Sequence, residues 1–408
     1  MTGAAMSRAQ LAASLAGLGL ALAGCVEHDR GVTGTQSIRV ELTAPQDPGA
    51  IDRRLPDENQ MPTITLSAYD AAGELDTSFE SDVDVYVQFL GTLTPTFDPT
   101  YGTGDDPLAT IHMANGVSTS DTIQLPLVFG PTTLWVDDAR SADPTYATGA
   151  SPIIWYRDPF IADIQRPLRE TAVDALTVSP LQNKQITINA SRYGTRGRLV
   201  VTSVFAQGYT VSDVQCADDA GTPPCIADAY DHVEVFSFSA PRGGNGRLLE
   251  QGQTIDGFSG GISEFNGLTE IGFPVTFGGS DEINPARVPD PVKLDVAWFN
   301  SLSDPAGRIN FERNEAGAIE IDNAVVCPLD KNYDTFNQWK LDPSGTGDCG
   351  NDVLNVITAG VVNGLDPATL VGKTLPRVVG MLRPLEIGNF NVWIIFPRSA
   401  ADLTLPPQ

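Results

Sequence analysis

The chain has 408 residues, with 25 Lys and Arg against 51 Asp and Glu, and a formal net charge of −26 at pH 7. Hydrophobic residues make up 41% of it, which is enough for packed cores and excludes a largely disordered chain. The acidic excess disfavours a nucleic-acid surface, because neutralising phosphates requires clustered Lys and Arg. A single core rarely grows past about 250–300 residues, so the length predicts two or three domains. The 39 Gly and 30 Pro residues, without long helical stretches, predict an all-β chain.

The first 24 residues are typical of an export signal. Arg8 supplies a short basic region, and the apolar run 11–22 is shorter than the roughly 20 residues that a spanning helix needs. The run ends in Leu22-Ala23-Gly24-Cys25, which resembles the lipobox of bacterial lipoproteins. The resemblance implies cleavage before Cys25, a diacylglyceryl group on its sulfur and acylation of its new amino group. The alternative is an ordinary signal peptide followed by a coincidental cysteine.

Lipidation of Cys25 implies a stable membrane anchor, because each buried CH₂ of the two or three acyl chains contributes about 0.8 kcal/mol. In many bacterial lipoproteins an Asp directly after the lipidated Cys favours retention in the inner membrane. Val26 stands at that position here, so the resemblance implies the outer membrane. Residues 25–36 are small and polar, and they predict a flexible tether.

The other four cysteines predict two structural disulfides. Four cysteines allow three pairings. Local pairing is favoured because each local pair brackets a Gly/Pro/Asp-rich loop that closes easily, and because an exported protein meets an oxidising compartment. A metal site is disfavoured, since no C-x-x-C occurs and the histidines are only His28, His112 and His232. The predicted pairs are Cys216–Cys225 and Cys327–Cys349.

Residues 37–156 predict a first β-domain. Strict alternation opens it at Ser37–Leu42, and further runs predict strands at 64–69, 83–89, 109–113, 122–128 and 132–136. With the segments "ITLSAYDAAGELD", "MANGVST" and "TYATGASPIIWY", the block resembles the Ig-like β-sandwich modules of bacterial surface proteins. It lacks the Cys…Trp…Cys core of antibody domains, so only the general architecture carries over. Residues 157–184 predict a connector, with a short helix near 168–176 as an alternative.

Residues 185–300 predict a second β-domain. It contains "RGRLVVTSVFAQGYTVSDV", which predicts two strands joined near Gly208, and later the glycine-rich "QGQTIDGFSGGISEFNGLTEI". These segments resemble the OB-fold modules that accompany secreted bacterial nucleases and phosphoesterases. Glycines such as Gly257 and Gly260 allow strands to bend enough to close a barrel.

Residues 306–405 resemble this second domain in pattern. The segment from Gly372 to Leu375 parallels the segment from Gly252 to Ile255, and "PRSAADL" resembles the end of such modules. The expected fold is therefore all-β, with an N-terminal Ig-like β-sandwich followed by two OB-like β-barrels in tandem. The alternative for the last block is a β-extension of a single barrel.

The sequence offers little that points to catalysis. Residues 257–261 match the G-x-S-x-G nucleophile elbow, but the elbow needs a helix after Ser259, and residues 262–271 alternate as a strand does. A triad in hydrolase order also needs a His after the Ser, and none follows His232. The expectation is a protein without catalytic residues and without a cofactor.

Calcium is the one metal that the sequence allows as an alternative. Several aspartates crowd around the loop between Cys216 and Cys225, and Ca²⁺ takes six to eight hard oxygen ligands. The spacing matches no EF-hand, and solvated surface acids are the competing interpretation. The candidate ligands are Asp213, Asp218, Asp219, Asp228 and Asp231.

The candidate binding residues lie on the first predicted barrel. Aromatic surfaces beside acids suit a neutral sugar, which Ca²⁺ could bridge. The candidates are Tyr209, Asp228, Tyr230 and Phe265. The local basic patch of Arg192, Arg196 and Arg198 contains too few cations for a nucleic-acid track in so acidic a chain.

The sequence thus predicts a non-catalytic protein, lipid-anchored at the bacterial outer membrane, that binds a glycan or another envelope protein through its β-domains. No nucleic-acid partner is expected. Two alternatives stay open. One is an OB-fold accessory protein for nucleic-acid or nucleotide substrates, and the other is a secreted hydrolase with an unrecognised site.

Overall fold

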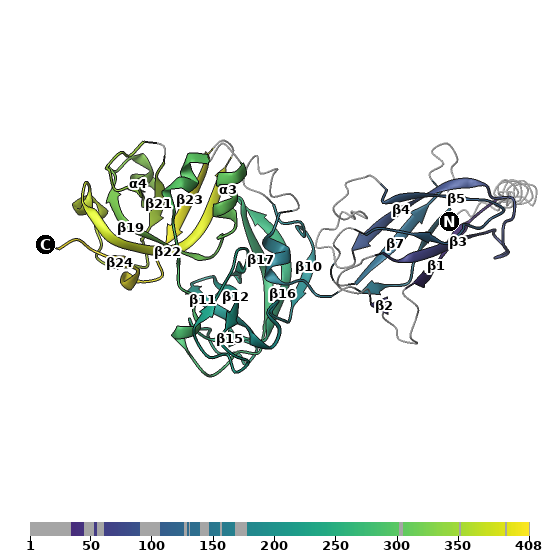
Figure 1. Ribbon diagram of the computed structural model, residues 1–408, viewed down its shortest axis with the longest axis horizontal. Coiled ribbons are helices and arrows are strands. Elements are labelled where there is room, and N and C mark those ends of the chain that lie inside the picture. The colour runs from purple at the N-terminus through teal and green to yellow at the C-terminus, as the bar shows by residue number, and fades with distance from the viewer. Residues whose placement is uncertain are drawn as a thin grey trace, which may run out of the picture.

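The computed structural model describes a chain built almost entirely of strands (Figure 1). Cys25, most of the predicted tether and the alternative helix near 168–176 lie outside the described residues. The described residues are 34–44, 53–54, 61–89, 107–125, 129, 131–138, 147–155, 157–167, 178–301, 305–350, 352–387 and 390–407.

The first block is a β-sandwich, as the alternation predicts. In β1 (Ser37–Ala44) the buried residues are Ile38, Val40 and Leu42, every second position, and they face a shared core. The sheet runs in the order β2-β9-β7-β8-β1-β3-β6, and β4 pairs with both β5 and β7. The other strands are β2 (Arg53–Arg54), β3 (Thr63–Tyr69), β4 (Ser81–Phe89), β5 (Ala109–Met113), β6 (Asp121–Thr122), β7 (Pro131–Asp137), β8 (Thr148–Ala150) and β9 (Ile154–Trp155).

One predicted strand in this block is much shorter than expected. The apolar run 122–128 predicted a strand, but β6 ends at Thr122, and residues 123–125 are not in a strand. Pro126 has no N–H to donate to a ladder, which opposes continued pairing along this run.

The connector carries a short helix, α2 (Ile161–Gln165). Ile161 and Ile164 are fully buried in one hydrophobic cluster that runs from the sandwich to the second block. The Gln165 amide donates to the backbone carbonyl of His232 at 2.7 Å, which ties the helix to β14 of the second block. The connector is therefore packed against folded structure.

The second block is a strongly bent, barrel-like sheet in the order β10-β16-β17-β14-β12-β11-β15, with β13 paired to β12. Most of its pairings are antiparallel, but β14 and β17 run parallel. Its elements are β10 (Gln185–Ile188), η1 (Gly194–Arg196), β11 (Gly197–Phe205), β12 (Gly208–Cys216), β13 (Cys225–Ile226), β14 (His232–Phe236), β15 (Thr254–Ile255), β16 (Gly257–Phe265), β17 (Leu268–Phe277) and η2 (Pro285–Arg287).

The third block is a closed sheet in the order β18-β19-β20-β21-β23-β22-β24, and an additional β19–β22 pairing closes the ring. Here β21 and β23 run parallel, as β14 and β17 do in the second block. Trp339, Leu341, Val356 and Ile395 fill the interior. The strands are β18 (Val292–Lys293), β19 (Ala318–Val326), β20 (Gln338–Asp342), β21 (Leu354–Ile357), β22 (Thr374–Ile387), β23 (Phe390–Phe396) and β24 (Leu403–Thr404).

Short helices that the sequence did not predict complete the third block. The side chain of Asp330 caps α4 by accepting from the N–H of Asn332, and Asn337 ends the helix in the left-handed region at φ 55°. The helices are η3 (Val296–Ser301), α3 (Pro305–Glu312), α4 (Lys331–Phe336), η4 (Pro367–Leu370) and η5 (Ala400–Asp402).

Both predicted disulfides are confirmed. Cys216 and Cys225 are bonded across paired positions of β12 and β13. Cys327, directly after β19, is bonded to Cys349, 22 residues further along the chain. Each bridge closes a loop within its own block.

The second and third blocks pack directly against each other (Figure 1). The backbone N–H of Tyr230 donates to the carbonyl of Arg313 at 2.8 Å, and that of Glu386 donates to the carbonyl of Asn266 at 2.6 Å. The buried Glu315 carboxylate accepts from the backbone N–H of Thr269 at 3.0 Å. The bonds to Asn266 and Thr269 hold the β16–β17 hairpin against the third block. The hairpin and the third block together form a cleft.

Candidate functional site

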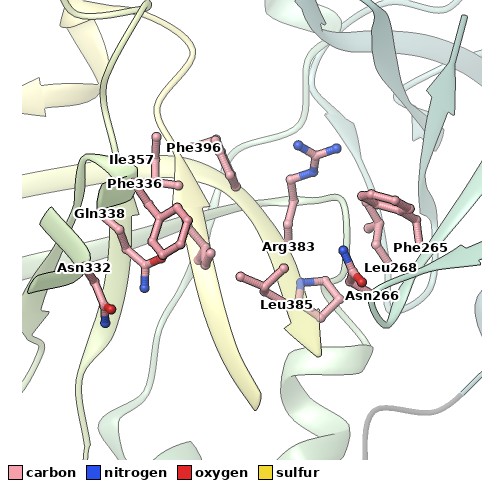
Figure 2. Close-up of a pocket in the computed structure, with 12 residues that line it drawn as sticks. Phe265, Asn266, Leu268, Asn332, Phe336, Gln338, Ile357, Arg383, Leu385 and Phe396 are labelled. Carbon is pink, nitrogen blue, oxygen red and sulfur yellow. The ribbon is translucent and has the colours of Figure 1, made fainter. Parts of the chain in front are cut away.

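A cleft of about 620 Å³ lies where the second block meets the third (Figure 2). In Figure 2, Phe336 and Gln338 lie on one side, Phe265 and Leu268 lie on the other, and Leu385 stands between them. Most of the lining is aliphatic or aromatic, which is typical of sites that bind small or apolar ligands. The full lining is Phe265, Asn266, Leu268, Asn332, Phe336, Gln338, Ile357, Arg383, Pro384, Leu385, Ile394 and Phe396.

The floor of the cleft is the outer face of the third sheet. Along β23, Trp393 and Ile395 belong to the inner core, whereas the alternating Ile394 and Phe396 face the cleft. A strand that is apolar on both faces needs a cover on each of them. Here the two walls of the cleft flank the second face.

The first wall is the β16–β17 hairpin. Its two-residue turn is Asn266-Gly267, with φ of 54° and 86°, and Phe265 and Leu268 pair across it. Both residues favour the left-handed region, as such a hairpin turn requires. The turn carries Phe265 to the cleft with 62% of its surface exposed.

The second wall is α4, whose last residue, Phe336, is also 62% exposed. Asn332 on α4 and Gln338 at the start of β20 add amide groups to this side. The amide of Gln338 is held by a 2.8 Å bond to the side-chain oxygen of Asn355. The two exposed phenylalanines therefore stand on opposite walls of one apolar cleft.

Arg383 is the only charged residue in the lining of the cleft. Its guanidinium forms an ion pair with Glu234 and lies 5.1 Å from the ring centre of Phe396 and 5.6 Å from that of Phe205. Glu234 is 1% exposed. Burial raises the pKa of Glu234 to about 7, although Arg383 opposes the shift. Burial also raises the pKa of the neighbouring Glu270.

A smaller cavity of about 140 Å³ adjoins the cleft. It shares Arg383 and Phe396 with the cleft, so these two side chains separate the two spaces. Its lining is more polar. The residues are Ser203, Val204, Phe205, Thr210, Glu234, Val361, Met381, Arg383, Phe396, Pro397 and Arg398.

Of the four predicted binding residues, the structure places only Phe265 at the cleft. Tyr209 has no exposed surface, and its hydroxyl is hydrogen-bonded to that of Thr276 at 2.8 Å within the second core. Tyr230 is buried with Ala162 and Ile309 where the connector, second block and third block meet. Both tyrosines are thus core residues in this structure.

The fourth candidate, Asp228, lies in an acidic cluster with Asp231 and Asp213. Tyr193 Oη is 2.6 Å from Asp231 and 2.9 Å from Asp228, and Arg192 Nε is 2.7 Å from Asp231. Burial raises the pKa of Asp231 and raises that of Asp213 to about 7. The Arg192 guanidinium thus supplies a positive charge among these carboxylates.

The other two predicted calcium ligands point elsewhere. Asp218 accepts from the backbone N–H groups of Ala220 and Thr222, and Asp219 accepts from the Thr195 hydroxyl. The five aspartates therefore do not converge on one position. Within the described ranges, no group of three His, Cys, Asp or Glu side chains is placed to hold a metal ion.

The basic patch of the second block is used for internal contacts. Arg192 pairs with Asp231, Arg196 donates to the carbonyl of Cys216, and Arg198 donates to backbone carbonyls, including that of Thr195. The guanidinium groups of Arg196 and Arg198 thus contact the stapled loop, at the carbonyls of Cys216 and Asp219, whereas that of Arg192 contacts Asp231.

A Ser–His pair that the sequence did not predict lies on the neighbouring strands β12 and β14 of the second sheet. The hydroxyl of Ser212 and Nδ1 of His232 are 2.6 Å apart, and both side chains are buried. Burial lowers the pKa of His232 to about 4, so the imidazole is neutral at pH 7. The adjacent cavity measures about 10 Å³, which holds about one water molecule rather than a substrate. The β12–β14 register places Ser212 opposite His232 and so brings the pair together, and the sequence does not reveal that register.

Ser259 of the G-x-S-x-G match is the third residue of β16, and the strand continues to Phe265. Residues 262–271 span the end of β16, the Asn266-Gly267 turn and the start of β17, so no helix directly follows Ser259 and the strand–turn–helix geometry of a nucleophile elbow is not formed there.

A second group of exposed apolar side chains lies on β14, β17 and the loop after β14. The rings of Phe236 and Phe238 are 4.6 Å apart, and those of Phe238 and Phe273 are 5.1 Å apart. The nearby Val275 is also exposed. None of these residues lines the cleft, so a substitution in this group can serve as a control for a substitution in the cleft.

Comparisons with known proteins add little to this geometry. No family model and no curated protein matches the chain. One similar solved structure is dimeric latent PorU from Porphyromonas gingivalis, at 11% sequence identity and a TM-score of 0.21. The match covers 88% of this chain and 34% of that chain, so this chain spans about a third of its length. A likeness this weak carries no argument. None of the helices in the described residues is both long and apolar enough to cross a membrane.

Proposed function

We propose that the protein is an exported lipoprotein of the bacterial outer membrane that binds an apolar component of the envelope without catalysing a reaction. The lipobox at Cys25 supports the anchor. The observation that carries the binding function is the apolar cleft of about 620 Å³ with exposed phenylalanines on both walls. Its size falls within the range of roughly 300–1,000 Å³ that is common for ligand sites.

The architecture that we propose is an Ig-like sandwich followed by two OB-like barrels. The second and third blocks share a strand order in which the third and fifth main strands run parallel, β14 with β17 and β21 with β23. OB-folds bind ligands on the face of their second and third strands and on the loops beside it. In the third block this face contains Gln338 and Ile357, which line the cleft.

Of the two expected partner classes, the lining disfavours a glycan. A sugar needs many hydrogen-bond partners, whereas this cleft offers one guanidinium and a few amides among apolar side chains. An apolar envelope component instead gains about 25 cal/mol for each Å² of apolar surface that it buries. The floor strands β21, β23 and β22 are paired with one another, so we expect binding to occur through side chains or alkyl groups.

The two alternative functions find less support. The arginines of the basic patch are bonded to Asp231 and to backbone carbonyls, which disfavours a phosphate track. The Ser212–His232 pair has space beside it for about one water only, which disfavours its use on a substrate.

A polarity-sensitive dye tests the binding site. Anilinonaphthalene sulfonate fluoresces on accessible apolar surface. We expect Leu385→Glu, which places a negative charge in the cleft, to remove most of the enhancement seen with the unmodified chain, because the dye is itself an anion. Val275→Glu places the same charge on an exposed apolar residue outside the cleft, and we expect it to leave most of the enhancement. Equal enhancement in all three proteins would contradict the assignment.

A further inference from the structure

The apolar cleft and the smaller cavity meet at Arg383 and Phe396. We propose, building on the proposed function, that the ligand is an amphiphile with one apolar chain in the cleft and an anionic head group beside Arg383. The shared chemistry of the head is an oxyanion, either a carboxylate or a phosphate.

The cleft and the smaller cavity differ in the share of charged and hydroxyl-bearing residues in their linings. The 620 Å³ cleft has an aliphatic and aromatic lining. The adjoining cavity, at about 140 Å³, far exceeds the roughly 10–15 Å³ that holds one water. Its lining combines apolar side chains with the hydroxyl-bearing residues Ser203 and Thr210, the carboxyl group of Glu234 and two arginines, Arg383 and Arg398. The cleft therefore suits an apolar chain, and the hydroxyl and guanidinium groups of the smaller cavity offer donors to a polar head.

Arg383 has unused hydrogen-bonding capacity for such a head. A guanidinium carries five N–H donors, and within the described part of the chain Arg383 donates one hydrogen bond, to Glu234. Its Nε is buried without a hydrogen-bond partner there. The rings of Phe205 and Phe396 hold the guanidinium in position. A carboxylate or phosphate is the acceptor that matches a guanidinium best. The other arginine, Arg398, is paired with Asp402 at 2.8 Å.

The acids that face Arg383 set the charge balance of the site. Glu234 on β14 pairs with it, and Glu270 on β17 acts on both of them. Glu234 Oε2 is buried without a hydrogen-bond partner among the described residues. Uptake of one proton by Glu234 would release Arg383 to the incoming anion and keep the net charge of the site at zero when a singly charged head binds. Binding of an anionic head is therefore expected to be tighter at pH 6 than at pH 8.

The test is calorimetric titration of residues 26–408, which retain every described residue, with C12 amphiphiles below their micelle concentrations. The probes are dodecanoate, dodecyl phosphate and dodecanol. We expect at least one anionic probe to bind about tenfold or more tightly than dodecanol, because charge-assisted hydrogen bonds are the strong ones. Dodecanoate is also expected to bind about fourfold more tightly per methylene than shorter alkanoates.

Arg383→Gln is expected to abolish the preference for the anion and to leave dodecanol binding within about twofold. The matched control is Arg377→Gln on the same strand, where Arg377 pairs with Glu320 outside the cleft, and it should keep the preference. Arg383→Gln leaves the buried Glu234 without its ion-pair partner and can therefore fail to fold. In that case the double variant Arg383→Gln/Glu234→Gln, which removes both charges, takes its place in the test.

The outcomes separate this inference from the proposed function. Tighter binding of dodecanoate points to a fatty-acid source and tighter binding of dodecyl phosphate to a phospholipid source, and either supports the inference. Equal binding of dodecanol and both anions would overturn the anionic head and leave the apolar cleft standing. Failure of all three probes to bind would overturn both.

Discussion

Tyr209 shows what strand alternation can and cannot predict about a single residue. The sequence correctly predicts that it lies in a strand, β12, but not which face of the strand it occupies. Almost all of β12 is buried on both faces, because the sheet curls around one core and packs against the stapled loop on the other side. Such a strand carries no polar alternation that could reveal its register.

Tyr209→Phe tests this core assignment. The change leaves the Thr276 hydroxyl without its buried partner, so we expect a loss of about 1 kcal/mol or slightly more in the free energy of unfolding. Urea unfolding would measure it. Binding of the C12 probes should stay unchanged, and a selective loss of probe binding with unchanged stability would contradict the assignment.

Buried carboxyl groups predict a pH dependence of stability that Glu264 can report. It accepts from the backbone N–H of Ser179 and the hydroxyl of Thr269, and burial raises its pKa from 4.5 to about 7. The folded protein therefore binds this proton more tightly than the unfolded chain. The resulting stabilisation is complete below pH 4.5 and is lost as the pH rises through 7.

Glu264→Gln removes this titration. We expect the free energy of unfolding of the variant, minus that of the unmodified chain, to increase from pH 5 to pH 8. Urea unfolding at both pH values would measure it. A constant difference between the two proteins across this range would contradict the raised pKa.

At the scale of elements, one wall of the cleft can be predicted from the sequence better than the other. The Asn266-Gly267 turn and its flanking strands follow from local turn chemistry. By contrast, α4 has six residues and no apolar helical repeat, so hydrophobic periodicity does not indicate that Phe336 ends a helix. The one local signal for this helix is Asp330, whose side chain caps it.

The two disulfides, which the sequence predicted correctly, should contribute unequally. The Cys327–Cys349 bridge spans 22 residues and the Cys216–Cys225 bridge spans 9. Because loop-closure entropy grows with length, replacing the longer pair by Ser should cost roughly 3 kcal/mol, and about 1 kcal/mol more than replacing the shorter pair. Chemical denaturation of the two double variants would measure this, and the opposite order would rule out an entropic origin.

At the scale of the whole molecule, the cleft depends on contacts that no local pattern reveals. Glu234 and Arg383 are 149 positions apart in the chain, and neither lies in a recognisable motif. Composition and alternation predicted the all-β class and the β-sandwich. The relative placement of the second and third blocks instead follows from tertiary contacts such as Glu386 with Asn266.

Membrane association is expected to depend on Cys25 alone. The described part of the chain contains no helix able to cross a membrane, and in the proposed lipoprotein all membrane affinity would reside in acyl chains. Cys25→Ser should therefore lose detergent-phase partitioning. Continued sedimentation of this variant with membranes would contradict the proposed anchor.

The measurement that tests the central claim most directly is methyl NMR of residues 26–408 titrated with dodecanoate. Ile357, Leu385 and Ile394 line the cleft, whereas Ile226 and Val275 are exposed elsewhere. The account predicts that the methyl signals of the three cleft residues shift with one common dissociation constant, while those of Ile226 and Val275 stay in place. Unmoved cleft signals, or equal shifts in both groups, would contradict it.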